Sequence, residues 1–237
     1  MESASSPTPL ILRRSAGDRW SIVAMAAVMV APVVALVAGA VALAGQSTGA
    51  AAFLMVMAAF LASLAVLVVN EARVRWGTRI ALDGPTLRLS LPARRGYVAH
   101  PPVHADLPIA SIASIDTRAE AFRSAGTTVI QRAYSLALVD GSRIVLGADR
   151  RLVDAYFASA AAAIAERAGI AIRDIGTVDG APGLLMLRGQ TVPGWDEAPL
   201  PVLLAEKRER QEGRAWKLVT IVLLITALVR LLASFLE

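Results

Sequence analysis

The most restrictive feature of this sequence is the stretch Trp20–Asn70, which contains no Asp, Glu, Lys, Arg or His. The hydrocarbon core of a bilayer is about 30 Å thick, and about 20 apolar residues in an α-helix cross it. The stretch is therefore long enough for two crossings, with the uncharged turn Gln46–Gly49 between them. A second apolar run, Leu218–Leu236, has Arg230 as its only charged residue. The sequence predicts an integral membrane protein with a helical hairpin in 20–70 and a third transmembrane helix in 218–236.

The composition supports this class and excludes several others. Hydrophobic residues make up 56% of the chain and charged residues 18%, which is more apolar than a typical soluble domain. Cysteine is absent, so disulfides, thiolate metal sites and cysteine nucleophiles are excluded. The strong bias towards arginine and alanine is typical of a GC-rich bacterial genome. The net charge of +5 is modest, and membrane topology explains it better than nucleic-acid binding does.

A cleaved signal peptide is the alternative interpretation of the first apolar segment. That segment has an apolar run of about 25 residues, whereas the apolar region of a signal peptide has about 7–15. A second apolar segment also follows at once. Both observations favour a retained transmembrane helix.

The distribution of basic residues predicts the orientation. Arginines lie at residues 13, 14 and 19 before the hairpin and at 73, 75 and 79 after it, and a charged segment at 206–217 precedes the third helix. The hairpin turn carries no charge. Because basic residues are retained on the cytoplasmic side, residues 1–19 and the region between the hairpin and the third helix are predicted to be cytoplasmic, and the C-terminus periplasmic. The predicted location is the bacterial inner membrane.

Residues 71–175 change to the period-2 alternation of β-strands. Strands are predicted over Thr78–Leu82 and Thr86–Leu91, with a turn at Asp83–Pro85. Residues 93–108 contain several prolines and are predicted to be a loop or a poorly paired strand. Further strands are predicted at about 112–122, 127–139 and 143–146.

One amphipathic helix is predicted to close this domain. Asp149 is the candidate N-cap, apolar residues recur at helical spacing from Leu152 to Ala168, and Gly169 suits the position after the last turn. Several antiparallel strands followed by one helix predict an α+β cytoplasmic domain.

These residues resemble a known family. The run Ile80-Ala-Leu-Asp-Gly-Pro-Thr-Leu-Arg-Leu, the run Leu107-Pro-Ile-Ala-Ser-Ile-Ala-Ser-Ile, and the following strand, Asp140-Gly141 turn, strand and helix resemble a bacterial pleckstrin-homology-like (PH-like) domain. The resemblance covers about 95 of the 237 residues. It implies a small, partly open β-barrel capped by a helix and used for binding or assembly. A ferredoxin-like or other α+β sandwich remains the alternative.

Residues 176–201 are rich in glycine and proline and are predicted to be a connector. Its apolar residues and Trp195 need burial, either on the domain or at the membrane surface. A charged juxtamembrane helix is predicted over 202–217, with Trp216 and Lys217 at the membrane interface.

Candidate catalytic and metal-binding residues are few. His100 and His104 have the spacing of a helical metal-binding pair, but Pro101 and Pro102 between them prevent that helix. Asp149, followed by two arginines, could begin an anion-binding helix terminus, although a capping aspartate is the simpler interpretation. The sequence contains no P-loop, dinucleotide fingerprint, Gly-x-Ser-x-Gly or His-Glu-x-x-His motif. We therefore expect no catalytic residues, metal or cofactor.

The basic residues near the membrane are the best candidates for a binding function. Each cation near an anionic leaflet contributes about 1 kcal/mol. The candidate lipid-headgroup residues are Arg73, Arg75, Arg79, Lys207, Arg208, Arg210, Arg214 and Lys217. Arg230 lies inside the third apolar run, where it either reaches the far interface or contacts a partner within the membrane.

The leading functional hypothesis is a non-enzymatic inner-membrane protein whose cytoplasmic domain docks a protein partner, as an accessory or assembly factor of a larger membrane complex. Its expected partners are membrane lipids and either a membrane-protein complex or further copies of the chain. The alternative is a module that senses anionic lipids or another ligand. An enzyme or transporter component is the third hypothesis, disfavoured because Arg230 is the only ionisable residue in the three predicted helices.

Overall fold

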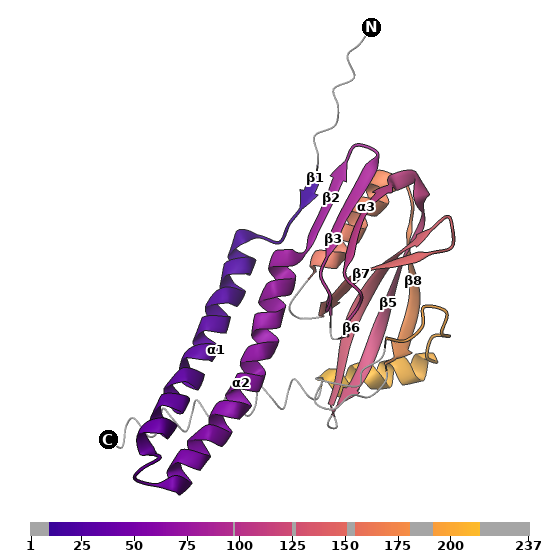
Figure 1. The fold of residues 1–237 in the computed structure, drawn as a ribbon. Helices are drawn as coiled ribbons and strands as arrows, with labels where there is room; N and C mark the ends of the chain where they lie inside the picture. Colours follow the sequence, from indigo (N-terminus) through magenta and orange to yellow (C-terminus); the bar gives the residue numbers. More distant parts are fainter. Residues whose placement is uncertain (1–9, 97, 125–126, 151–154, 181–191, 214–237) are drawn as a thin grey trace, which may run out of the picture. The chain divides into compact units, whose positions relative to one another are not determined.

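A computed structural model describes residues 10–96, 98–124, 127–150, 155–180 and 192–213. They form an α+β structure with two four-stranded sheets (Figure 1). The chain divides into two compact units. The first unit comprises the described residues of 1–93 together with 101–107, and the second comprises 94–100 and the described residues from 108 onward.

The first unit contains the two helices predicted from the uncharged stretch, α1 (Ala16–Leu43) and α2 (Thr48–Gly77). Ser15 and Ser47 cap their N-termini, because their hydroxyl oxygens accept hydrogen bonds from the amides of Asp18 and Ala50. Both helices are long and apolar enough to cross a membrane, which supports membrane association. The third predicted span, 218–236, lies outside the described residues.

Small residues line the contact between α1 and α2. Ala51, Ala58 and Ala65 of α2 are spaced seven residues apart and are all buried, as is Ala40 of α1. Gly39 of α1 also lies close to a side chain of α2. Small side chains let helix backbones approach closely, so α1 and α2 can pack side by side.

The first sheet has the strand order β1-β2-β3-β4. Its strand β2 follows directly from the end of α2 (Figure 1). Its strands are β1 (Leu10–Leu12), β2 (Arg79–Asp83), β3 (Thr86–Leu91) and β4 (Val103–Pro108). β2 pairs antiparallel with both β1 and β3, and Leu10 lies opposite Leu82 while Arg79 lies opposite Ser90. The alternation gives one buried face, formed by Ile80, Leu82, Leu87, Leu89 and Leu91. We call the opposite face of this sheet its outer face.

One of these strands was not predicted and another was left open. No strand was predicted before the hairpin, where β1 lies, because three residues are too few to show a period in the sequence. β4 lies in the segment 93–108 that was predicted to be a loop or a poorly paired strand, and the structure shows a strand. Its prolines limit the strand without interrupting it, because Pro101 and Pro102 precede it and Pro108 is its last residue.

The second sheet has the order β7-β6-β5-β8 and belongs to the second unit. The 3₁₀ turn η1 (Ile109–Ser111) leads into β5 (Ile112–Ser124), which is followed by β6 (Thr127–Leu138) and β7 (Arg143–Arg150). After helix α3 (Tyr156–Ala168), β8 (Ile172–Asp179) returns parallel to β5. β8 therefore extends past residue 175, into the segment predicted to be a connector. A further helix covers residues 202–213.

The two faces of the second sheet differ in chemistry. On one face, Ile115, Ala121 and Leu136 are buried, and α3 contributes Phe157 and Ile164 to the interior. On the other face most of the buried side chains are polar: Asp116, Arg118, Glu120, Gln131 and Ser135 are each at most 2% exposed, and Ala133 and Phe122 are the apolar residues buried beside them. We call this second face the polar face.

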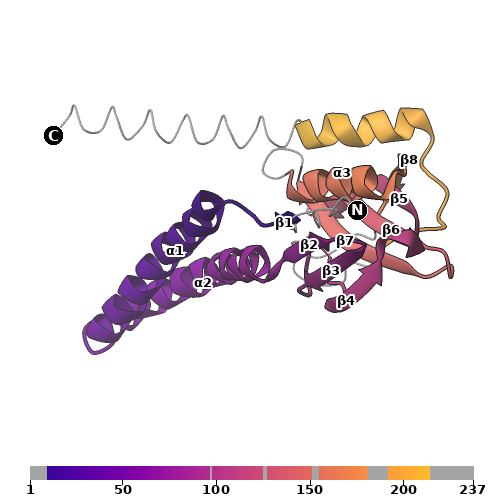
Figure 2. The same cartoon turned by 90° about the horizontal axis from the view of Figure 1, so that it is seen from above.

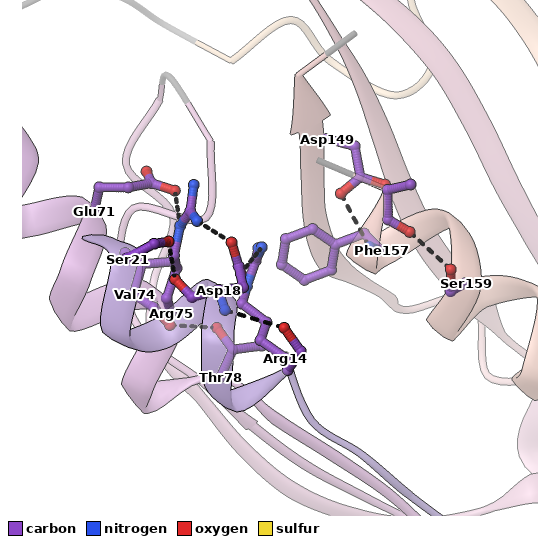
Figure 3. Close-up of polar contacts among 12 residues, drawn as sticks. Arg14, Asp18, Ser21, Glu71, Val74, Arg75, Thr78, Asp149, Phe157 and Ser159 are labelled. Atoms are coloured by element: carbon purple, nitrogen blue, oxygen red, sulfur yellow. Dashed lines mark hydrogen bonds and ion pairs between the residues drawn. The ribbon is translucent and has the colours of Figure 1, made fainter. Parts of the chain in front are cut away.

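The start of α3 corrects the predicted cap. Asp149 lies in β7, and α3 begins later, at Tyr156. The Asp149 carboxylate nevertheless caps the helix from the strand, since it accepts hydrogen bonds from the amides of Phe157 (3.0 Å) and Ala158 (2.7 Å) (Figure 3). Gly169 ends α3 with a φ of 66°, as predicted.

Gly147 in β7 allows Phe157 to pack. A Cβ atom on Gly147 would lie 2.3 Å from Cζ of Phe157, which is 1% exposed, and the φ of Gly147 is +149°. We expect the Gly147→Ala variant to lose about 1–3 kcal/mol of stability, because the buried ring must shift to make room for the added Cβ atom. Hydrogen exchange of α3 amides measures the loss. Gly17→Ala is the matched control, since no atom lies within 4 Å of its added Cβ, and an equal loss in both variants would contradict the prediction.

The α+β class is confirmed, but the barrel is not. The described strands form two separate sheets with no closed barrel among them. Figure 2 shows β2, β3 and β4 of the first sheet side by side. The PH-like resemblance therefore stays a prediction.

Candidate functional site

The first candidate feature is an ion cluster that joins the start of α1 to the end of α2 (Figure 3). Arg75 donates from Nε to Oε1 of Glu71 at 3.1 Å and from Nη1 to Oδ1 of Asp18. Nη1 of Arg14 lies 3.7 Å from Oδ2 of the same aspartate. Arg14 and Arg75 are each 6% exposed, so these contacts are protected from solvent. The cluster closes the end of the hairpin from which the first sheet emerges.

Two tryptophans lie at the same end of the hairpin. The rings of Trp20 and Trp76 meet edge to face, with centroids 5.6 Å apart, and they are 62% and 42% exposed. The guanidinium of Arg19 lies 5.0 Å from the centroid of the Trp76 ring. Exposed tryptophans beside cations are typical of the membrane–water interface.

The structure separates the predicted headgroup-binding residues into two groups. Arg73, Arg79, Lys207 and Arg210 are exposed. Arg75 is buried in the ion cluster, and Arg208 forms two hydrogen bonds with the carboxylate of Asp179, at 2.9 and 2.7 Å. The guanidinium groups of Arg75 and Arg208 are therefore paired with carboxylates of the protein itself. Arg214, Lys217 and Arg230 lie outside the described residues.

A groove of about 500 Å³ lies on the outer face of the first sheet. Arg79, Arg88 and Ser90 line it from β2 and β3, and His104 and Asp106 line it from β4. Ser90 Oγ lies 3.3 Å from Nδ1 of His104. The groove is shallow, its floor is partly apolar through Ala81, Leu89 and Ala105, and two arginines give it a positive character.

The second unit contains a buried charge pair on the polar face. Arg118 donates from Nε and Nη2 to Oε1 of Glu120, at 2.9 and 2.7 Å. The other carboxylate oxygen of Glu120 accepts from the side-chain amide of Gln131 at 2.7 Å. Arg118 is 0% exposed and Glu120 1% exposed. Such a pair is stable only because further hydrogen bonds satisfy its remaining groups.

Arg118 also holds the connector against the sheet. Its Nη1 and Nη2 donate to the carbonyl oxygens of Gly194 and Pro193, both at 2.6 Å. The Trp195 ring lies 4.1 Å from the guanidinium, and Arg143 lies 5.0 Å from the same ring. Of the two locations predicted for Trp195, the structure shows the one on the domain. We call these contacts of Arg118 with residues 193–195 the Arg118 clamp.

The helix over 202–213 is attached to the same unit. Besides the Arg208–Asp179 pair, the carboxylate of Glu212 accepts a hydrogen bond from the amide of Ile130 at 3.0 Å, and Gln211 accepts one from Thr128 at 3.1 Å. The described residues 192–200 and this helix thus form part of the folded second unit.

A third ionic group lies further along the polar face. Asp116, 2% exposed, accepts hydrogen bonds from Arg143 at 2.7 Å and from Arg173 at 2.9 Å. Burial by itself would raise the pKa of Asp116, but the hydrogen bonds from the two arginines outweigh it and lower the pKa below its ordinary value. The carboxylate is therefore held ionised.

The surroundings of His100 disfavour a positive charge on its imidazole ring. It is 9% exposed, and burial, followed by the positive charges of Arg95 and Arg118, lowers its pKa from 6.5 to about 4. His100 is consequently neutral at pH 7. It belongs to the second unit and His104 to the first.

The described part of the chain has no group of three or more His, Asp or Glu side chains able to hold a metal ion. A cavity of about 270 Å³ beside Tyr134 and Asp149 brings a hydroxyl and a carboxylate together. Both oxygens of that carboxylate are engaged in capping α3.

The sequence interpretation missed the Arg118 clamp. The only signal was Asp116, Arg118 and Glu120 at alternate positions of one strand, and this pattern is usual for a solvent-exposed face. Gly194 and Trp195 gave no indication of their partner, because they lie more than 70 residues away from it in the chain.

Comparisons with known proteins do not assign a family. No family model matches the chain, and neither the curated proteins nor the solved structures contain a match.

Proposed function

We propose that the protein is a non-enzymatic bacterial inner-membrane protein whose cytoplasmic domain docks a protein partner, as an accessory or assembly factor of a larger membrane complex. In this proposal three transmembrane helices anchor the chain. A PH-like role for the domain, in binding and not in catalysis, agrees with the resemblance of residues 80–168.

The observation that carries the proposal is the rigid attachment of the first sheet to the hairpin. α2 ends at Gly77 and β2 begins at Arg79, and the intervening Thr78 donates from its amide and its hydroxyl to the carbonyl of Val74. β1, which precedes α1, pairs with β2, which follows α2, so the sheet is connected to both helices of the hairpin. A surface held in one position loses less conformational entropy when a partner binds.

The pairing of β1 with β2 also bears on topology. β1 precedes α1 and β2 follows α2, so the pairing requires both ends of the hairpin to lie on the same side of the membrane. The positive-inside rule makes that side cytoplasmic.

The pairing of the buried acids supports a binding role. Asp149 caps α3, Glu120 is paired with Arg118, and Asp116 with two arginines. The two arginines lower the pKa of Asp116, so this carboxylate stays ionised and does not readily exchange a proton with a substrate.

A test is purification of the tagged full chain from native membranes in mild detergent, with mass spectrometry of the co-purifying proteins. We expect a membrane-protein partner in stoichiometric amount. A short Gly-Ser segment inserted between Gly77 and Thr78 should reduce its recovery at least about fivefold, because the first sheet is then no longer fixed to α2.

The matched control is the same insertion in the exposed turn at Asp140–Ser142, which should leave the recovery unchanged. A chain that purifies without any protein partner, or equal recovery from both insertions, would contradict the proposal.

A further inference from the structure

We propose that the groove on the outer face of the first sheet binds the phosphate of an anionic lipid headgroup at the membrane surface. This inference goes beyond docking of a protein partner. It depends on the membrane location of the hairpin and not on the existence of that partner.

The charges in the groove suit an anion. Arg79 is exposed and forms no ion pair with any of the described residues. Arg88 lies 3.0 Å from Asp83, but these side chains are 58% and 46% exposed, so water screens the pair and it holds Arg88 only weakly. Each guanidinium offers several donors in a planar fork that matches phosphate. Asp106 is the only acid that lines the groove.

The pairing of the strands places these donors together. Arg79 lies opposite Ser90, and Ala81 lies opposite Arg88, so both arginines occupy the outer face within one strand pair. The hydroxyl of Ser90, next to His104, adds a neutral donor near Arg79. The groove thus joins two cations with hydroxyl and imidazole groups in a space of about 500 Å³.

The position of the groove in the first unit selects a lipid as the source of the phosphate. The apolar part of α2 ends at Val69, and the helix continues through residues 70–77, about 12 Å at 1.5 Å per residue. Trp76, in its last turn, pairs with Trp20 as expected at the interface. Arg79 follows within three residues, so its side chain reaches the layer in which phosphates of the cytoplasmic leaflet lie.

The test uses the purified full chain in a non-ionic detergent, titrated with dihexanoyl-phosphatidylglycerol and, separately, with dihexanoyl-phosphatidylcholine. We expect binding of the anionic lipid only. The double variant Arg79→Gln/Arg88→Gln should bind it about 25-fold more weakly, at about fivefold for each cation. The control Arg123→Gln/Arg132→Gln removes the same charge from the second sheet and should change binding less than about threefold.

Three results would overturn the inference. Equal losses in the two double variants would show a general effect of net charge, and equal binding of both lipids would show that the headgroup charge is not recognised. Displacement of the lipid by inorganic phosphate at equal concentration would assign the groove to a soluble anion. None of these results depends on a protein partner, because the chain is separated from any co-purifying protein by size-exclusion chromatography before the titration, so this inference and the proposed function fail independently.

Discussion

Replacement of Arg118 by alanine is expected to destabilise the second unit by about 3–5 kcal/mol. In this variant the Glu120 carboxylate, which is 1% exposed, loses the two hydrogen bonds from Arg118 and keeps the one from Gln131. An unpaired buried carboxylate loses its hydration without compensation, and this is the main cost. The carbonyl oxygens of Pro193 and Gly194 lose their donor as well.

Hydrogen exchange in detergent micelles measures this effect locally, at the amides of β5 and β6. A local measurement is needed because a chain with two units need not unfold in a single step. The matched control is Arg132→Ala, which removes an arginine from β6 whose 2.8 Å pair with Asp174 is about half exposed. That variant should lose at most about 1 kcal/mol, and an equal loss in both would contradict the role of burial.

A second variant separates the charge pair from the Arg118 clamp. Arg118→Met/Glu120→Gln removes both charges, so most of the stability of the sheet should return. The connector, however, still lacks the Arg118 guanidinium, which donates to the carbonyl oxygens of Pro193 and Gly194 and contacts the Trp195 ring. We expect a protease to cut residues 192–200 faster in this variant than in the wild-type protein, by at least about tenfold. Unchanged cleavage would show that the connector is held without Arg118.

The second large effect expected is a loss of stability between pH 6.5 and 4, caused by His100. Its pKa is about 4 in the folded protein and 6.5 ordinarily, so in this range the unfolded state binds more protons. Stability is therefore fully present above pH 6.5 and falls as the pH is lowered to about 4. The difference of about 2.5 pKa units corresponds to roughly 3 kcal/mol.

Thermal unfolding of the second unit at pH 7 and at pH 4.5 checks this expectation. The variant His100→Gln should lose most of the difference between the two pH values, because glutamine does not titrate. His104→Gln is the matched control and should keep the full difference, since His100 is still present. The same acid sensitivity in His100→Gln and wild-type protein would exclude His100 as its source.

Part of the candidate site was predictable from sequence and part was not. Arg73 lies in the last turns of α2 and Arg79 in β2, and both are exposed, as the local pattern indicated. Arg75 has the same local context but is buried, because Asp18 and Glu71 meet it from two helices. Its partner Asp18 lies 57 residues away in the chain, and no local pattern contains that information.

The sequence alone determined the helical hairpin, most strands and the end of α3. These features follow from local physics: the hydrophobic length of a helix, the period of two in a strand, and the tolerance of Gly169 for positive φ. Tertiary structure decided how the strands divide into two sheets, where β1 and β8 pair, and that Arg118 is buried against the connector. Pairing and burial depend on residues distant in the chain, and a charged side chain alternating along a strand looks the same whether water or Gly194 lies opposite it.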